Sequence, residues 1–169
     1  MYNKIYIIGP VGSGKTTLAR LIADKYNIKH YELDKIVWND EEHIKREEKE
    51  IQELFKKIIN KKSWIIEDVG RSIFINGIKK ADIVYYLDLS KITIYKRCIS
   101  RWIKQKIGKE KYNYKPTLKS LYEMLKWAKQ DINKKDEKIK RIITYSKKYK
   151  LIKKIDTLLS IEVDKLLEI

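Results

Sequence analysis

Short apolar runs alternate along the chain with longer segments in which apolar residues recur every three or four positions. The runs are typical of buried strands, and the longer segments are typical of amphipathic helices. Strands that alternate with helices predict βαβ units, a parallel sheet and an α/β fold. The expected strands are 4–8, 30–33, 64–66, 83–87 and 151–155, and the expected helices are 15–26, about 40–60, 90–107, 117–149 with a break near residue 133, and 161–167.

Polar residues with capping side chains stand before three of the expected helices. Asn39 or Asp40 precedes the acid-rich helix that is expected to run to about Asn60, Ser90 precedes the next, and Thr117 the one after. Their side chains can accept hydrogen bonds from the first backbone N–H groups of a helix. The segment 108–115 is polar and rich in Lys, and we expect it to be a mobile loop between two helices.

Acidic residues and a glycine stand directly after four of the expected strands. In an open parallel sheet, ligands bind beyond the carboxyl ends of the strands. We therefore expect one rim of the sheet to gather Gly9, Asp34, Glu67, Asp68 and Asp88.

The segment from Gly9 to Thr16 fits the phosphate-binding pattern G-x-x-x-x-G-K-[ST] at every fixed position. Glycines allow the backbone to wrap closely around phosphates, and the following helix directs its N-terminal dipole at the anion. Lys15 is expected to reach the β- and γ-phosphates, and the Thr16 hydroxyl to bind Mg²⁺. The sequence therefore predicts ATP or GTP binding by Gly9, Val11, Gly12, Ser13, Gly14, Lys15, Thr16 and Thr17.

Two adjacent acids, Glu67 and Asp68, end the third expected strand. A carboxylate opposite a phosphate-binding loop can hold a water bound to Mg²⁺. A strand-terminal acid can also simply cap a turn. The pattern assigns the metal to this pair without distinguishing its members.

Three further residues are candidates for binding the phosphoryl acceptor. Asp34 can orient a hydroxyl or accept its proton, or can contact a base or sugar if the acceptor is a phosphate; it can also be only a helix cap. Arg71 can clamp an anion through two hydrogen bonds. Trp38 is either a substrate contact or a core residue.

Arg97 and Arg101 lie four residues apart on the expected helix 90–107 and therefore share a face. Two neighbouring guanidinium groups suit the spread negative charge of a phosphoryl group in transfer. The alternative is a solvated helix face.

The net charge of +16 and the single cysteine limit the classes of function. The charge suits nucleic acid or an anionic substrate, but lysine is spread along much of the chain, as a biased genome would produce. Cys98 cannot form an intrachain disulfide, no apolar run approaches about 20 residues, and the first residues are too quickly interrupted for a signal peptide. We expect a cytoplasmic protein without a membrane segment. Neither a zinc-ligand cluster nor a Ser-His-Asp arrangement is recognisable.

The chain resembles the adenylate-kinase-like branch of P-loop proteins and, more closely, the DNA topology modulation protein group. Besides Gly9 to Thr17, the resemblance rests on Leu33-Asp34 with Trp38, the segments 64–67 and 81–89, and the basic helix that carries Arg97 and Arg101. It implies a single domain over residues 1–169, with five parallel strands in the order 2-3-1-4-5 and a lid from about 97 to 117. It also implies that Arg71 holds an acceptor phosphate, although Asp68 stands where the adenylate-kinase-like pattern has Gly.

These observations favour a Mg²⁺-dependent kinase that transfers a phosphoryl group from ATP to a nucleoside, nucleotide or other metabolite. An NTPase associated with nucleic acid, with the segment 108–114 as its contact, is a second hypothesis. A nucleotide-binding regulator without catalysis is a third. The sequence does not distinguish a monomer from a homodimer.

Overall fold

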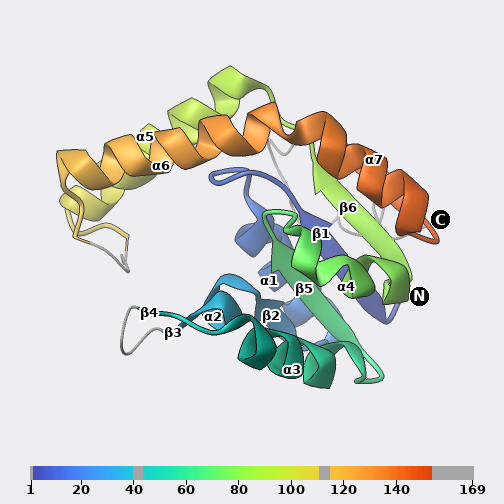
Figure 1. Ribbon diagram of the computed structural model, residues 1–169. Helices are drawn as coiled ribbons and strands as arrows, with labels where there is room; N and C mark the ends of the chain where they lie inside the picture. Colours follow the sequence, from blue (N-terminus) through green and yellow to red (C-terminus); the bar gives the residue numbers. More distant parts are fainter. Residues whose placement is uncertain (1, 40–43, 111–114, 154–169) are drawn as a thin grey trace.

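A parallel five-stranded sheet forms the centre of the protein in a computed structural model that describes residues 2–39, 44–110 and 115–153 (Figure 1). Its strands lie in the order β2-β5-β1-β6-β7, and every neighbouring pair is parallel. Numbered among themselves, these strands follow the expected 2-3-1-4-5. The strand labels skip from β2 to β5 because β3 and β4 form a separate antiparallel pair outside this sheet. The strands of the sheet are β1 (Lys4–Ile8), β2 (His30–Glu32), β5 (Trp64–Asp68), β6 (Ile83–Leu87) and β7 (Tyr149–Ile152).

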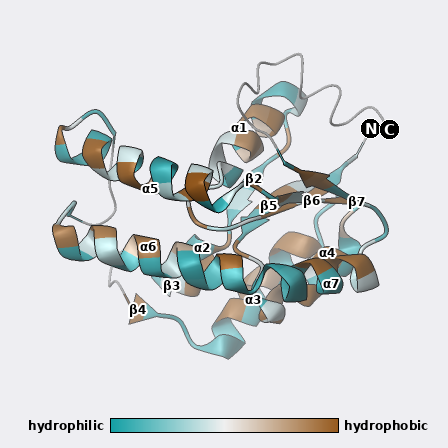
Figure 2. Cartoon of the chain, turned by 90° about the horizontal axis from the view of Figure 1, so that it is seen from above, coloured by the Kyte–Doolittle hydropathy of each residue, from teal (hydrophilic) through white to brown (hydrophobic). Residues whose placement is uncertain are grey.

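Helices cover both faces of the sheet, because its inner strands are apolar on both sides. Helix α1 (Lys15–Tyr26) packs on the face that carries Ile5, Ile7 and Ile65. The other face packs against α3 (Glu48–Ile59) and α4 (Ile75–Lys80). In Figure 2, α1 lies on one side of the strands, and α3, α4 and α7 (Lys135–Tyr145) lie on the other. The predicted α/β fold with a parallel sheet is confirmed, and it has three layers.

Two antiparallel helices, α5 (Lys91–Lys106) and α6 (Leu118–Asn133), lie side by side and reach beyond the sheet (Figure 1). We call this pair the arm. Ile94, Cys98 and Ala128 are buried between its helices and the sheet rim. Two of the three expected caps are confirmed, since the Ser90 side chain accepts from the Thr93 N–H and Thr117 forms a capping box with Ser120. Helix α7 follows α6 after a break at Lys134, close to the predicted position.

The prediction of one helix from Asn39 or Asp40 to Asn60 is wrong at its start. A short helix α2 (Asp34–Val37) leads into β3 (Trp38–Asn39), which pairs with β4 (Ile44–Lys45), and α3 begins only at Glu48. Asp40 lies outside the described residues. Arg46 holds this segment through hydrogen bonds to the carbonyl oxygens of Lys35, Ile36 and Trp38, a tertiary interaction that periodicity does not reveal.

Smaller differences concern the ends of other elements. Strand β7 begins two residues before the expected position, and β5 includes Glu67 and Asp68. A 3₁₀ turn at Ser72–Phe74 and the short helix α4 were not predicted, because one or two turns carry too little periodicity. The helix expected at 161–167 lies outside the described residues.

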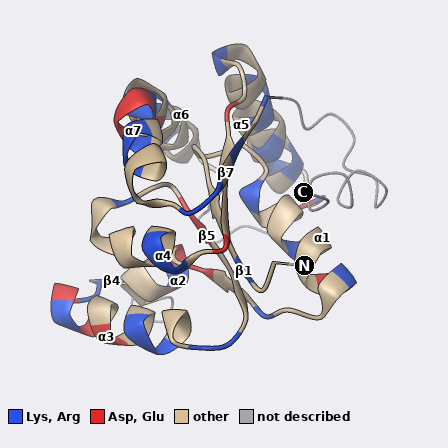
Figure 3. Ribbon diagram, turned by 90° about the vertical axis from the view of Figure 1, so that its right-hand side faces the viewer, with Lys and Arg blue, Asp and Glu red and all other residues tan. Residues whose placement is uncertain are grey.

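Positions of Lys and Arg recur along α5 and α7, and acidic positions occur on β5 (Figure 3). Ion pairs between Arg71 and Asp68 and between Lys138 and Asp131 bring opposite charges together there. Within the described ranges, no helix has the length and apolar character that crossing a bilayer requires.

Candidate functional site

The phosphate-binding loop connects the end of β1 to the start of α1 and is shaped by its glycines. Gly12 has a φ of 77° and Gly14, the N-cap of α1, a φ of 95°. These values lie in the left-handed region, which residues with a Cβ rarely adopt. At Gly9, an added Cβ would come within 2.8 Å of Ser13 Oγ. The predicted context of the motif, a strand before it and a helix after it, is confirmed.

Lys15 lies at the first position of α1, and its Nζ donates a hydrogen bond to the carbonyl oxygen of Pro10 at 2.9 Å. Burial lowers the pKa of Lys15, because a charged ammonium is poorly solvated there, and the negative charges of Glu67, Asp34 and other acids offset only part of this effect. The side chain is therefore a cation enclosed by the loop that is expected to hold an anion.

Thr16 and Glu67 meet at the edge of the sheet. The Thr16 hydroxyl donates to Glu67 Oε1 at 2.8 Å. Glu67 is 5% exposed, and its Oε2 has no hydrogen-bond partner among the described residues. His30 Nε2 lies 3.6 Å from Oε1. A buried carboxylate oxygen without a donor, next to a threonine hydroxyl, fits a hydrated Mg²⁺ ion.

The alternation of side chains along β5 separates Glu67 from its neighbour Asp68. Glu67 points to the face that α1 covers, like Ile65, whereas Asp68 points to the opposite face, like Ile66. Asp68 Oδ2 accepts from the backbone N–H groups of Gly70 and Arg71, the former at 2.7 Å. Asp68 Oδ1 accepts from the Arg71 guanidinium. The structure therefore gives Asp68 the role of holding the turn after β5.

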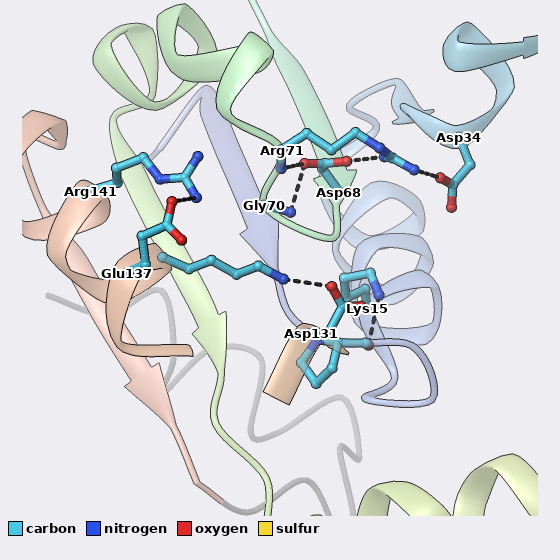
Figure 4. A network of polar contacts seen from close by, with 10 residues as sticks. Lys15, Asp34, Asp68, Gly70, Arg71, Asp131, Glu137 and Arg141 are labelled. Carbon is cyan, nitrogen blue, oxygen red and sulfur yellow. Dashed lines mark hydrogen bonds and ion pairs between the residues drawn. The ribbon is translucent and has the colours of Figure 1, made fainter. Parts of the chain in front are cut away.

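Arg71 links the ends of two strands at the rim. Its guanidinium bonds Asp68 through one nitrogen and Asp34 through another (Figure 4). Burial alone would lower the pKa of Arg71, but the charges of Asp68 and Asp34 outweigh burial and raise it. Asp34 is the first residue of α2, and its side chain is 63% exposed. The structure thus brings together two of the predicted acceptor-binding residues.

The third, Trp38, is separated from Asp34 by the length of α2. It begins β3, and its backbone N–H donates to the carbonyl oxygen of Asp34. The residue is 39% exposed, so it is not part of the core.

Arg97 and Arg101 are both on α5 but differ in their surroundings. Arg97 Nη1 donates to the carbonyl oxygen of Ser13 at 3.1 Å and lies against Gly14, so it contacts the phosphate-binding loop. Arg101 Nε lies 3.2 Å from Glu110 Oε1, and about half of its side chain is exposed. Only Arg97 lies at the loop in this arrangement.

Lys138 and Asp131 form a pair at this rim that the sequence analysis did not single out. Lys138, on α7, is 5% exposed, and its Nζ donates to Asp131 Oδ1, on α6, at 2.7 Å. Figure 4 shows Asp131 beside Lys15. Lys138 stands four residues before the buried Ile142, and a lysine on the apolar face of a helix is the one signal in the sequence that points to it.

Comparisons with known proteins agree with this geometry. The model of the family described as "ATPase family associated with various cellular activities (AAA)" matches residues 5–80, somewhat less than half of the chain. A shikimate kinase from Sulfurihydrogenibium sp. (strain YO3AOP1) is 30% identical over 110 residues. That match covers 56% of this chain and 66% of the relative, slightly less than two thirds of its length.

Several solved structures are similar over almost the whole chain. A shikimate kinase from Bacteroides thetaiotaomicron superposes with a TM-score of 0.64 at 15% identity and covers 100% of both chains. The shikimate kinase from Acinetobacter baumannii in complex with shikimate has a TM-score of 0.63 at 14% identity, covering 98% of this chain and 91% of that one. The fold is that of the P-loop kinases.

A deoxyadenosine kinase from M. mycoides with bound dATP shares the P-loop kinase fold as well. Its TM-score is 0.53 at 15% identity, and the superposition covers 98% of this chain and 97% of that one. Because kinases with different acceptors share this fold, the fold by itself leaves the acceptor open.

Proposed function

We propose that the protein is a Mg²⁺-dependent phosphotransferase that transfers the γ-phosphoryl group of ATP to a small-molecule acceptor. One observation carries this proposal. The P-loop with Lys15, the Thr16–Glu67 pair and the Asp34–Arg71 pair lie along one edge of the sheet. Donor phosphates, a metal and an acceptor must meet in this way for phosphoryl transfer. The similarity to kinases supports the proposal.

The loop and the start of α1 hold the phosphates of ATP in this proposal. Backbone N–H groups from Val11 to Thr17 supply hydrogen bonds, and the dipole of α1 favours the anion. Lys15 exchanges its bond to the Pro10 carbonyl for the β- and γ-phosphate oxygens. Arg97 already contacts the loop and adds a second positive charge.

Thr16 and Glu67 are the residues that would hold Mg²⁺. The Thr16 hydroxyl would be a direct ligand, and Glu67 would hold a water of the ion through the oxygen that lacks a partner among the described residues. When bound, the ion neutralises charge on the β- and γ-phosphates. We assign the metal to Glu67 and not to Asp68, since Asp68 holds Gly70 and Arg71 on the other face.

Asp34 and Arg71 bind the phosphoryl acceptor in this proposal. Asp34 is exposed at the rim and can orient a hydroxyl group or accept its proton, while Arg71 binds a negatively charged group of the same molecule. Trp38, at the end of α2, borders this space. Nucleosides, nucleotides and hydroxylated metabolites are the acceptor classes, and shikimate and deoxyadenosine are specific candidates because related kinases are named for them.

The lid of this enzyme would run over residues 97–117, from α5 of the arm to the N-cap of α6, and residues 111–114 of it lie outside the described residues. Arg101 joins Arg97 at the transferring phosphoryl group only after it leaves Glu110. Closure of the arm excludes water, which would otherwise compete with the acceptor.

We further place the protein in the cytoplasm, as one domain over residues 1–169, and as a monomer or homodimer. The resemblance to the DNA topology modulation protein group stays a prediction. A nucleic-acid-associated NTPase or a non-catalytic regulator is less well supported, since neither needs an acceptor site opposite the P-loop.

ADP release in the presence of Mg²⁺ and ATP tests the proposal. The acceptor panel contains shikimate, nucleosides, deoxynucleosides, nucleoside monophosphates and sugars, with single-stranded DNA and RNA as separate additions. We expect release that depends on one small-molecule class. Release that requires DNA or RNA would favour the NTPase, and tight ATP binding without turnover would favour the regulator.

A further inference from the structure

The Lys138–Asp131 pair is a buried ion pair that joins the arm to the body of the protein. Asp131 lies near the end of α6, Lys138 lies on α7, and the break at Lys134 separates the two helices. The side chain of Lys138 is 6% exposed and that of Asp131 is 16% exposed. Burial of two charges costs free energy that their attraction repays only with good geometry and further hydrogen bonds.

Those further hydrogen bonds are incomplete. An ammonium group has three N–H donors, and the described residues give Lys138 one acceptor, Asp131 Oδ1. The stem of Lys138 packs against Gly70, where an added Cβ would lie 3.1 Å from Lys138 Cδ. The turn that Asp68 holds thus fixes the stem, and within the described part of the chain two donors of the ammonium have no acceptor.

Asp131 pairs with one cation at the rim and acts electrostatically on a second. It bonds Lys138, and Figure 4 draws it in the same part of the site as Lys15, whose Nζ bonds the Pro10 carbonyl. Its negative charge partly offsets the effect of burial on the pKa of Lys15. A carboxylate beside Lys15 and Lys138 occupies the kind of position that a phosphate oxygen would take, since both are anions that accept several hydrogen bonds.

We propose that Asp131 is a resting-state substitute for a phosphate of the nucleotide, and that Lys138 transfers from Asp131 to a phosphoryl oxygen when ATP binds. The inference rests on the proposed function, because it concerns the same nucleotide. Asp131 then opposes ATP binding and Lys138 favours it. Because Asp131 belongs to α6 and Lys138 to α7, release of the pair also removes a side-chain link across the junction of these two helices.

The two partners therefore differ in the sign of their effect on ATP affinity. Lys138→Met keeps the stem that packs on Gly70 and removes the charge, and we expect ATP to bind roughly tenfold more weakly. Asp131→Asn keeps the shape and removes the competing charge, and we expect ATP to bind several-fold more tightly. Lys140→Met and Glu137→Gln are matched controls, because both residues are exposed on α7, and neither should change the affinity.

Isothermal titration calorimetry with Mg²⁺ and ATP on the wild type and the four variants tests the inference, with melting temperatures to confirm folding. Opposite shifts for Lys138→Met and Asp131→Asn support it. Equal affinities, or weakening in both variants alongside equal losses of melting temperature, would show a purely structural pair and overturn it. If the wild type itself failed to bind ATP, the proposed function would fall together with this inference.

Discussion

Glu67 and Asp68 show how one step along a strand separates the surroundings of two adjacent acids. They are adjacent in the sequence, and the pattern alone assigned the metal to either of them. In the structure they point to opposite faces of the sheet, and only Glu67 reaches the Thr16 hydroxyl. The assignment follows from the two-residue period of a strand, together with the face on which α1 packs.

We predict that Glu67→Gln weakens the use of Mg²⁺. The amide keeps the size of the side chain but removes the negative charge that would hold a metal-bound water. The Mg²⁺ concentration needed for half-maximal ATP binding should rise by about 10- to 100-fold. Glu32→Gln is the control, since Glu32 is the register partner of Glu67 on β2 but pairs with Lys35 and Arg20. An unchanged Mg²⁺ requirement in Glu67→Gln would show that Glu67 takes no part in Mg²⁺ binding.

At Lys15, the burial that suits phosphate binding lowers the stability of the folded protein. Burial lowers its pKa below the ordinary 10.5, so the folded protein binds this proton less tightly than the unfolded chain does. Below the lowered pKa the buried charge therefore reduces stability. As the pH rises from the lowered pKa towards 10.5, this cost disappears and stability increases.

Lys15→Met is accordingly expected to melt at a higher temperature than the wild type at about pH 7, in the absence of nucleotide. The difference between the two proteins should shrink as the pH approaches 10.5, because the wild-type lysine then loses its proton. Thermal melts of both proteins across this pH range measure the effect. A variant that melts lower at neutral pH, or a difference that grows with pH, would contradict this account of Lys15.

At the scale of elements, the phosphate-binding loop packs closely against α5. Gly12 lies against α5, where an added Cβ would come within 2.8 Å of Cys98 Sγ. Gly14 likewise lies against Arg97 on α5. The loop glycines therefore serve two purposes, since they allow positive φ angles and admit a helix of the arm close to the loop.

Gly12→Ala should destabilise the protein by about 1–3 kcal/mol and weaken ATP binding, because the new methyl group meets both an unfavourable φ and Cys98. Gly108→Ala separates these causes, since Gly108 has a φ of 74° but no atom within 4 Å of the added Cβ. Chemical denaturation of both variants gives the comparison. Equal losses would show that the contact with α5 is unimportant, and recovery of part of the loss in Gly12→Ala/Cys98→Ala would show that it matters.

The elements also show what the sequence could reveal. The strands, α1, α5 and the P-loop followed from periodicity and capping, because their signals are local. The start of α3 did not follow from such signals. Arg46 holds the segment before α3 through the backbone carbonyl groups of Lys35 and Trp38, and hydrophobic periodicity does not reveal contacts of this kind. The Lys138–Asp131 pair was missed because lysine is abundant in the chain, and burial of one lysine depends on how α7 packs.

At the scale of the whole molecule, the sheet rim collects residues from β5, α1, α2, α5, α6 and α7 into one site. In the proposed enzyme, the body would supply the metal and acceptor residues, whereas the arm would supply Arg97, Asp131 and, after it leaves Glu110, Arg101. In the proposed mechanism, this division would let the nucleotide enter while the arm is open and would delay the chemistry until the arm has closed. The net charge of +16 attracts ATP and an anionic acceptor, and it therefore raises the rate at which both encounter the protein.

Acceptor-dependent ADP release by the wild type and by Lys15→Met, with Mg²⁺ and ATP, is the decisive measurement for phosphoryl transfer at the P-loop. We expect release by the wild type with one class of small-molecule acceptor, and none above background by Lys15→Met, although this variant is folded. Turnover by Lys15→Met close to that of the wild type would contradict this expectation, because the phosphoryl transfer would then not take place at the P-loop.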